Sequence, residues 1–167
     1  FPIVKKGDNI AKLIFSALEN ENVTLDEGDI IIVAHKVVSK AEGRTVDLKD
    51  IRPSKRAQEI ASVTSKDPRL IETILGETKR TVKATPEIFI VVNKQGHVCI
   101  NAAVDKSNVE GTDGYLLLPE DPDKSAKQIR SEITNLTGKK VSVLISDTYS
   151  RPFRTGQVEL TVGIAGM

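Results

Sequence analysis

Two short segments contain the residues best suited to chemistry. In each, an apolar, strand-like run stops on an aspartate with hydroxyl or amide side chains nearby: Asp105 lies between Asn101 and Asn108, and Asp147 precedes Thr148. A strand fixes the position of such an aspartate, and the loop that follows leaves the carboxylate open to solvent. Oxygen ligands of this kind suit a hard cation such as Mg²⁺ or Mn²⁺. The two segments therefore predict an all-oxygen metal site.

Two arginines, Arg151 and Arg154, follow the second aspartate and are stiffened by Pro152 between them. Guanidinium groups bind phosphate oxygens in a bidentate way, so this pair favours an anion site over a solvated charged face. Each aspartate taken alone is equally well explained as the cap of a turn. In combination with the arginines, the aspartates indicate metal-assisted phosphoryl chemistry.

A third segment is basic and follows a run of apolar residues, Ile30–Ala34. It contains Lys36 and Lys40, which either bind nucleotide phosphates or form a solvated charged surface. The sequence has no P-loop and no glycine-rich dinucleotide fingerprint, so any nucleotide must be held by another device. Neither a zinc-ligand spacing nor a nucleophile elbow is present, and no covalent enzyme nucleophile is expected.

The composition limits the class of protein. A chain of 167 residues can form one domain with a core, or two small lobes. Its net charge of +1 gives a nucleic-acid partner no electrostatic support. No run approaches the roughly 20 apolar residues of a membrane span. The single cysteine, Cys99, has apolar neighbours and is predicted to be a buried thiol, which fits a reducing, cytoplasmic compartment.

The elements that must position these residues indicate an α+β fold of mixed β-sheets with flanking helices. Periodicity predicts strands over Ile30–Ala34, Ile88–Val92, Val98–Ala102, Tyr115–Leu118, Val141–Ile145 and Val158–Ile164, the first and fifth of them buried. Helices are predicted after Asp8, near Ser54, after Pro68 and from Ser125 to Gly138. Gln95 and Gly96 predict a hairpin turn, and Ser125 with Gln128 predicts a capping box.

The ends of the sequence are unusual. It starts on Phe1 with no initiator methionine and stops at Met167, directly after a strand-like alternation. We therefore expect a single N-terminal portion, residues 1–167, of a longer protein.

Taken together, these segments resemble the coenzyme F-420-0:L-glutamate ligases, the GTP-dependent gamma-glutamyl ligases of coenzyme F-420 (F420) biosynthesis. The matching stretches occur in the family's order and span essentially the whole chain: Gly28–Ile31, Val38–Gly43, Asn101–Val109, Leu117–Asp123, Ile145–Arg154 and Gly163–Gly166. Four positions depart from the family's pattern: His35 stands where glutamine is common, Ala103 and Ser150 where glycine is common, and Phe153 where tryptophan is common.

The resemblance implies a homodimeric enzyme of gamma-glutamyl-ligase-like fold that binds GTP, Mg²⁺ or Mn²⁺, and a monovalent cation such as potassium. The positions that match nucleotide contacts are Phe1, Pro2, Ile3, Val4, His35, Lys36, Lys40 and Asn108. The positions that match metal ligands are Asp105, Asp147 and Thr148. In the family, a glutamine ligand and more of the nucleotide site come from a C-terminal region of several dozen residues that this sequence does not contain.

The reaction implied by the resemblance joins L-glutamate to the carboxylate of coenzyme F-420-0. GTP phosphorylates that carboxylate, and the glutamate amine attacks the acyl phosphate, with release of GDP and phosphate. Arg151 and Arg154 are then expected to contact phosphate or substrate. Two alternatives stay open: a related metal-dependent ligase with another acid substrate, and a non-catalytic fragment that binds nucleotide or mediates dimerisation.

Overall fold

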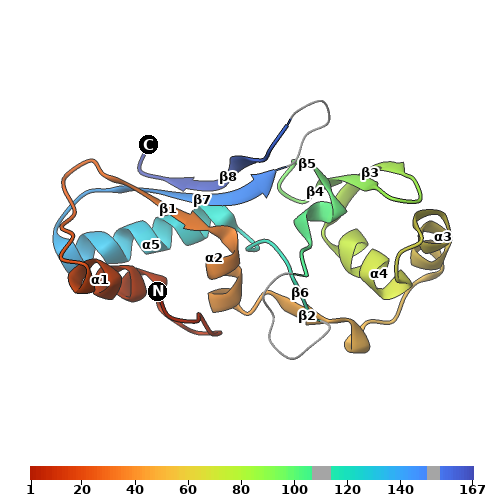
Figure 1. The fold of residues 1–167 in the computed structure, drawn as a ribbon, viewed down its shortest axis with the longest axis horizontal. Helices are drawn as coiled ribbons and strands as arrows, with labels where there is room; N and C mark the ends of the chain where they lie inside the picture. The colour runs from red at the N-terminus through yellow and green to blue at the C-terminus, as the bar shows by residue number, and fades with distance from the viewer. Residues whose placement is uncertain (107–113, 150–154) are drawn as a thin grey trace. The chain divides into compact units, whose positions relative to one another are not determined.

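The computed structural model describes residues 1–106, 114–149 and 155–167. The chain forms two compact units (Figure 1). Unit 1 is discontinuous and consists of Phe1–Arg44 and Leu118–Met167, whereas unit 2 is the intervening segment Thr45–Leu117. Helices alternate irregularly with short strands in three separate sheets, which confirms the predicted α+β class.

Unit 1 is built on a three-stranded sheet in the order β1-β7-β8, in which β7 is parallel to β1 and antiparallel to β8. Its elements are α1 (Ile10–Asn20), β1 (Ile30–Ala34), α2 (His35–Glu42), α5 (Pro122–Thr137), β7 (Ser142–Tyr149) and β8 (Val158–Ala165). The core lies between this sheet and the helices, where Val38, Ile133, Val143 and Ile145 are at most 1% exposed. The helices thus cover one face of the sheet.

The helix starts in unit 1 differ from the predicted ones. Asn9, not Asp8, caps α1, because its side chain accepts the N–H of the third helical residue. In the same way Asp121 caps α5, which begins at Pro122 and so starts three residues before Ser125. Proline suits this first position, where its missing N–H has no partner to lose. The predicted capping box is therefore wrong, while the predicted helix itself is confirmed.

Strand β1 has the predicted bounds but not the predicted burial. Ile30 and Ile32 are 51% and 66% exposed, whereas Val33 is 7% exposed. Successive side chains of a strand point to opposite faces, so only alternate residues of β1 reach the helices. The expectation of a fully buried strand is wrong, because the helices that the structure describes cover only one face of this sheet.

Unit 2 contains two small antiparallel sheets and two helices. Its elements are β2 (Thr45–Asp47), α3 (Lys55–Thr64), α4 (Pro68–Gly76), β3 (Thr78–Ala84), β4 (Phe89–Asn93), β5 (Val98–Ile100) and β6 (Gly114–Leu116), with short 3₁₀ turns at Leu48–Asp50 and Asn101–Ala103. Strand β2 pairs with β6, and β3, β4 and β5 form a meander. The core side chains Ile71, Ile74, Phe89 and Val91 are fully buried. The hairpin predicted at Gln95 and Gly96 is confirmed as the β4–β5 connection.

Two further properties bear on function. The thiol of Cys99 is only half-buried, because β5 is a short outer strand of its sheet, so the expected core position is wrong. None of the described helices combines the length and the apolar character needed to cross a membrane.

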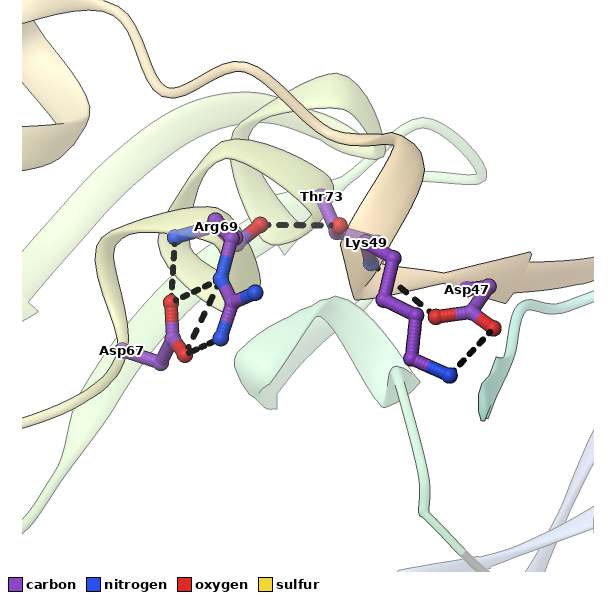
Figure 2. Close-up of polar contacts among 5 residues, drawn as sticks. All are labelled: Asp47, Lys49, Asp67, Arg69 and Thr73. Carbon is purple, nitrogen blue, oxygen red and sulfur yellow. Dashed lines mark hydrogen bonds and ion pairs between the residues drawn. The ribbon is translucent and has the colours of Figure 1, made fainter. Parts of the chain in front are cut away.

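The start of α4 carries an ion pair that couples helix capping to charge (Figure 2). Asp67 accepts the backbone N–H of Arg69 at 2.8 Å, and the guanidinium of Arg69 donates to the same carboxylate, with its terminal nitrogen 2.6 Å from Oδ2. These side-chain hydrogen bonds hold the pKa of Asp67 below its ordinary value, although partial burial opposes the shift. The ionised carboxylate is therefore the form that stabilises the fold.

Replacing Asp67 with Ala should lower the free energy of unfolding at neutral pH by about 1 kcal/mol, the usual cost of losing an N-cap. Because the pKa is depressed in the folded state, the contribution is complete above the unfolded-state pKa and is lost as pH falls through the folded-state pKa. Urea unfolding at neutral and acid pH tests this. The deficit of the variant should shrink in acid, and an equal deficit at both pH values would contradict it. Glu87→Ala, at an exposed carboxylate of the same unit, is the control.

Candidate functional site

The candidate site of unit 1 lies at the edge of the sheet where β1 and β7 end together. The two strands are parallel, and Ala34 is in register with Ser146. Asp147 therefore follows Ser146 at the same level at which His35 follows Ala34. Helix α2 begins at His35 with no intervening loop (Figure 1). In α/β structures, ligands bind beyond the carboxyl ends of parallel strands, which makes this edge the natural place for a site.

Asp147 and His35 face each other at this edge. The Nε2 atom of His35 lies 3.0 Å from Oδ1 of Asp147, although the alignment is not that of a good hydrogen bond. The other ring nitrogen is 3.5 Å from the hydroxyl of Ser39, one turn along α2. His35 is 2% exposed and Ser39 is fully buried, whereas the Asp147 side chain is 18% exposed. The buried imidazole of His35 thus contacts the carboxylate of Asp147 and helps to fix its position.

The start of α2 lies at this edge, and the residue before it, Ala34, makes no side-chain hydrogen bond that caps the helix. The backbone N–H groups at the start of a helix, together with the helix dipole, favour phosphate. Lys36 lies in this first turn, and Lys40 lies one turn later on the same side of the helix, as residues four apart do. Phosphate binding by the two lysines stays a prediction.

Thr148, the next residue of β7, has different surroundings from Asp147. Adjacent residues of a strand point to opposite faces, and Asp147 shares the helix-covered face with Ile145. Thr148 therefore projects from the other face, where it is exposed. Its hydroxyl donates a hydrogen bond of 2.9 Å to Oε1 of Glu159, the residue opposite it on β8. The sequence alone had given Glu159 no role.

Asp105 belongs to unit 2 and follows a strained turn. Asn101, Ala102 and Ala103 have φ angles of 52°, 55° and 61°, three successive left-handed residues that are not glycine. Each costs roughly 1–2 kcal/mol, and such strain concentrates at functional sites. After the turn, Asp105 exchanges backbone hydrogen bonds with Leu116, at 3.1 and 2.8 Å. The left-handed φ of Ala103 also explains why glycine would suit that position.

The N-terminal segment borders an apolar cavity that extends to the end of β1 and to Val37 of α2. Phe1 and Ile3 are both 68% exposed, and Val4 is buried. The cavity, of about 410 Å³, is formed by Phe1, by one side of α1 and by residues 31–34 of β1. Among the described residues that line it, Glu21 alone has a charged side chain, and neither Asp147 nor Thr148 is one of them. This cavity suits an apolar group and not a phosphate.

Three predicted site residues, Asn108, Arg151 and Arg154, lie outside the described residues. Within the described part of the chain, no three His, Cys, Asp or Glu side chains gather closely enough to hold a metal ion. At the sheet edge the structure places the carboxylate of Asp147 and the hydroxyl of Thr148 on opposite faces of β7. Both are hard ligands of the type that Mg²⁺ and Mn²⁺ accept.

Comparison with known proteins gives the family. The model of the F420-0:Gamma-glutamyl ligase family matches residues 1–167. Proteins named coenzyme F420:L-glutamate ligase are similar over nearly the whole chain: that of Methanothermobacter thermautotrophicus is 46% identical over 99% of this chain and 66% of its own length, that of Methanopyrus kandleri 44% over 98% and 63%, and that of Methanocaldococcus jannaschii 43% over 99% and 64%.

The chain thus spans a little under two thirds of the length of these curated relatives. The match nevertheless covers every segment on which the resemblance was based, from Gly28 to Gly166. On these matches, the chain belongs to the F420-0:gamma-glutamyl ligase family.

Proposed function

We propose that the protein is a ligase that uses GTP to join L-glutamate to the carboxylate of coenzyme F420-0. The observation that carries this proposal is the sheet edge, where the start of α2 and the carboxylate of Asp147 follow the ends of two parallel strands at the same level. An anion-binding helix start beside a hard-cation ligand is the combination that a nucleotide–metal complex requires. The names of the relatives supply the substrates.

The nucleotide phosphates are assigned to the first turn of α2. Because the ring of His35 is buried against Asp147, its contact with a phosphate would be made by its backbone N–H. Lys36 and Lys40 add positive charge along the same side of the helix. We propose that Phe1, Pro2, Ile3, Val4 and Asn108 complete the nucleotide contacts, and that Arg151 and Arg154 contact phosphate or substrate.

Asp105, Asp147 and Thr148 are the proposed ligands of divalent metal. When bound, the cation offsets the negative charge of the phosphate oxygens during phosphoryl transfer. The contribution of the chain's own residues is to fix these oxygens in advance: Asp147 by its contact with His35, and Asp105 by backbone pairing. We also predict that the protein binds a monovalent cation such as potassium, forms a homodimer and is located in the cytoplasm.

The carboxylate of F420-0 must be activated before an amine can attack it, because an ionised carboxylate is a poor electrophile. In the proposed reaction a carboxylate oxygen of F420-0 forms a bond to the γ-phosphorus of GTP as the bond to GDP breaks. The glutamate amine then forms the amide bond at the acyl carbon and loses a proton, and phosphate leaves. Every bond change occurs between the substrates, so the protein binds, orients and neutralises charge, with no covalent enzyme intermediate.

Calorimetric titration with GTP and with ATP, each with and without Mn²⁺, tests the proposal on the complete gene product. GTP should bind, and its affinity should rise with Mn²⁺. Lys36→Ala should weaken GTP binding by roughly tenfold, because a contact between a half-buried lysine and a phosphate contributes on the order of 1 kcal/mol. Lys12→Ala, an exposed lysine of α1, is the matched control. Two results would contradict the assignment: no metal-dependent binding of nucleotide, or equal GTP affinity in Lys36→Ala and the unaltered protein.

A further inference from the structure

The contact between Thr148 and Glu159 has no role in the proposed reaction as stated so far. Thr148 lies near the end of β7 and Glu159 near the start of β8, and the two residues are in register across the antiparallel pair. The threonine hydroxyl donates to Oε1 of the glutamate at 2.9 Å. Both side chains are exposed, so neither is needed to fill the core.

The direction of this hydrogen bond matters for a metal ligand. A hydroxyl group has one hydrogen and two lone pairs, and a cation can be bound only through a lone pair. A threonine that is free to rotate presents its hydrogen to an approaching cation as readily as its oxygen. An ionised carboxylate is an acceptor only, so it holds the hydrogen of Thr148 on its own side. The lone pairs are then directed away from Glu159 before any cation arrives.

We propose that Glu159 is a positioning residue of the metal site, which acts by fixing the hydroxyl orientation of Thr148. This inference rests on the proposed function, because it assumes that Thr148 binds the divalent cation. Groups that orient a metal ligand in this way typically change metal affinity by 10- to 100-fold when they are removed. His35 stands in the same relation to Asp147, so both metal-ligand positions of β7 have a partner from a neighbouring element.

The test measures Mn²⁺ affinity, and not only activity, in the complete gene product with saturating GTP, by calorimetry or by the resonance signal of free Mn²⁺. Glu159→Ala should weaken Mn²⁺ binding about tenfold. Glu159→Gln should recover most of that loss, because its amide oxygen accepts the same hydrogen bond. Glu19→Gln, which removes an exposed carboxylate from α1, should leave the affinity unchanged.

A double-mutant cycle with Thr148→Val separates positioning from direct binding. If Glu159 acts through Thr148, Glu159→Ala should have no further effect in the Thr148→Val background. A further loss in that background, or a Glu159→Gln variant as weak as Glu159→Ala, would show that Glu159 binds the metal itself and would overturn the inference. Normal affinity in Glu159→Ala alone would overturn it as well.

The same cycle distinguishes the inference from the function on which it rests. If Thr148→Val binds Mn²⁺ as well as the unaltered protein does, the assignment of Thr148 as a ligand fails and the inference fails with it. If Thr148→Val binds weakly while Glu159→Ala binds normally, only the inference fails.

Discussion

Asp147→Asn should lower turnover by at least about 100-fold while leaving the fold intact. The substitution keeps the size of the side chain but removes the charge that a hard cation requires. Residues that merely orient a metal ligand already account for 10- to 100-fold effects, so loss of the ligand itself should exceed them. The structure predicts little change in stability, because the side chain is partly exposed and its partner is His35 rather than a buried cation.

The measurement is the rate of glutamate addition by the complete gene product, together with thermal unfolding and Mn²⁺ titration. Asp26→Asn is the matched control, since Asp26 is an exposed aspartate of the same unit and lies in a turn before β1. The variant at position 147 should lose Mn²⁺ binding and turnover together. Near-normal turnover in Asp147→Asn would refute the assignment of this carboxylate.

Gly163→Ala is the substitution with the largest expected effect on stability. Gly163 lies in β8 where the strand meets the start of α5, and an added Cβ would be only 2.5 Å from the carbonyl carbon and oxygen of Pro122. These are backbone atoms, so they cannot rotate aside. The backbone N–H of Ile164 also donates to Asp123, at 2.8 Å, which ties the same two segments together. The strand and the helix must separate to admit a methyl group.

We expect Gly163→Ala to lower the free energy of unfolding by about 3 kcal/mol, at the upper end of the usual cost of overpacking. Gly76→Ala is the control, because Gly76 ends α4 and a Cβ there would meet nothing within 4 Å. That change should be neutral or slightly stabilising, since alanine favours a helix over glycine. Urea unfolding of both variants gives the comparison. Equal stability of the two variants would mean that β8 and α5 are not packed as described.

Local signals were sufficient for the helices of unit 2. Ser54 caps α3 and Pro68 opens α4, as their sequence positions predict. The buried Ile71 and Ile74 follow the helical spacing. In contrast, β3 was missed because Lys79, Arg80 and Lys83 interrupt its apolar pattern; its pairing with β4 supplies what the local sequence does not.

Helix α2 was missed for another reason. It has only eight residues and no side-chain cap, so neither length nor a start signal marks it, and its stability comes from packing on β1 and β7. The contact of His35 with Asp147 depends on the parallel pairing of two strands far apart in the sequence. Periodicity within either segment contains no information about that pairing.

In the candidate site, too, some residues can be identified from the local sequence and others only from the pairing of the strands. Asp147 and Thr148 could be selected from the sequence, because a strand-like run leads directly to them. Glu159 could not, since its contact with Thr148 depends on the register of β7 and β8, which shifts between Ile145 and Ser146. Its acidic side chain on an alternating strand indicated only a wetter face.

The way in which unit 2 interrupts unit 1 has a consequence for how the protein is made on the ribosome. Unit 2 is contiguous, and its first and last strands, β2 and β6, pair with each other, so it is complete once Leu117 has been synthesised. Strand β1 must wait for β7, since Ile30 pairs with Ser142. The 25 residues from Leu117 to Ser142 take about 1–5 s to synthesise at 5–20 residues per second. The nascent chain therefore spends this interval with a finished inserted unit and an unpaired apolar strand, which is when a chaperone would be most useful.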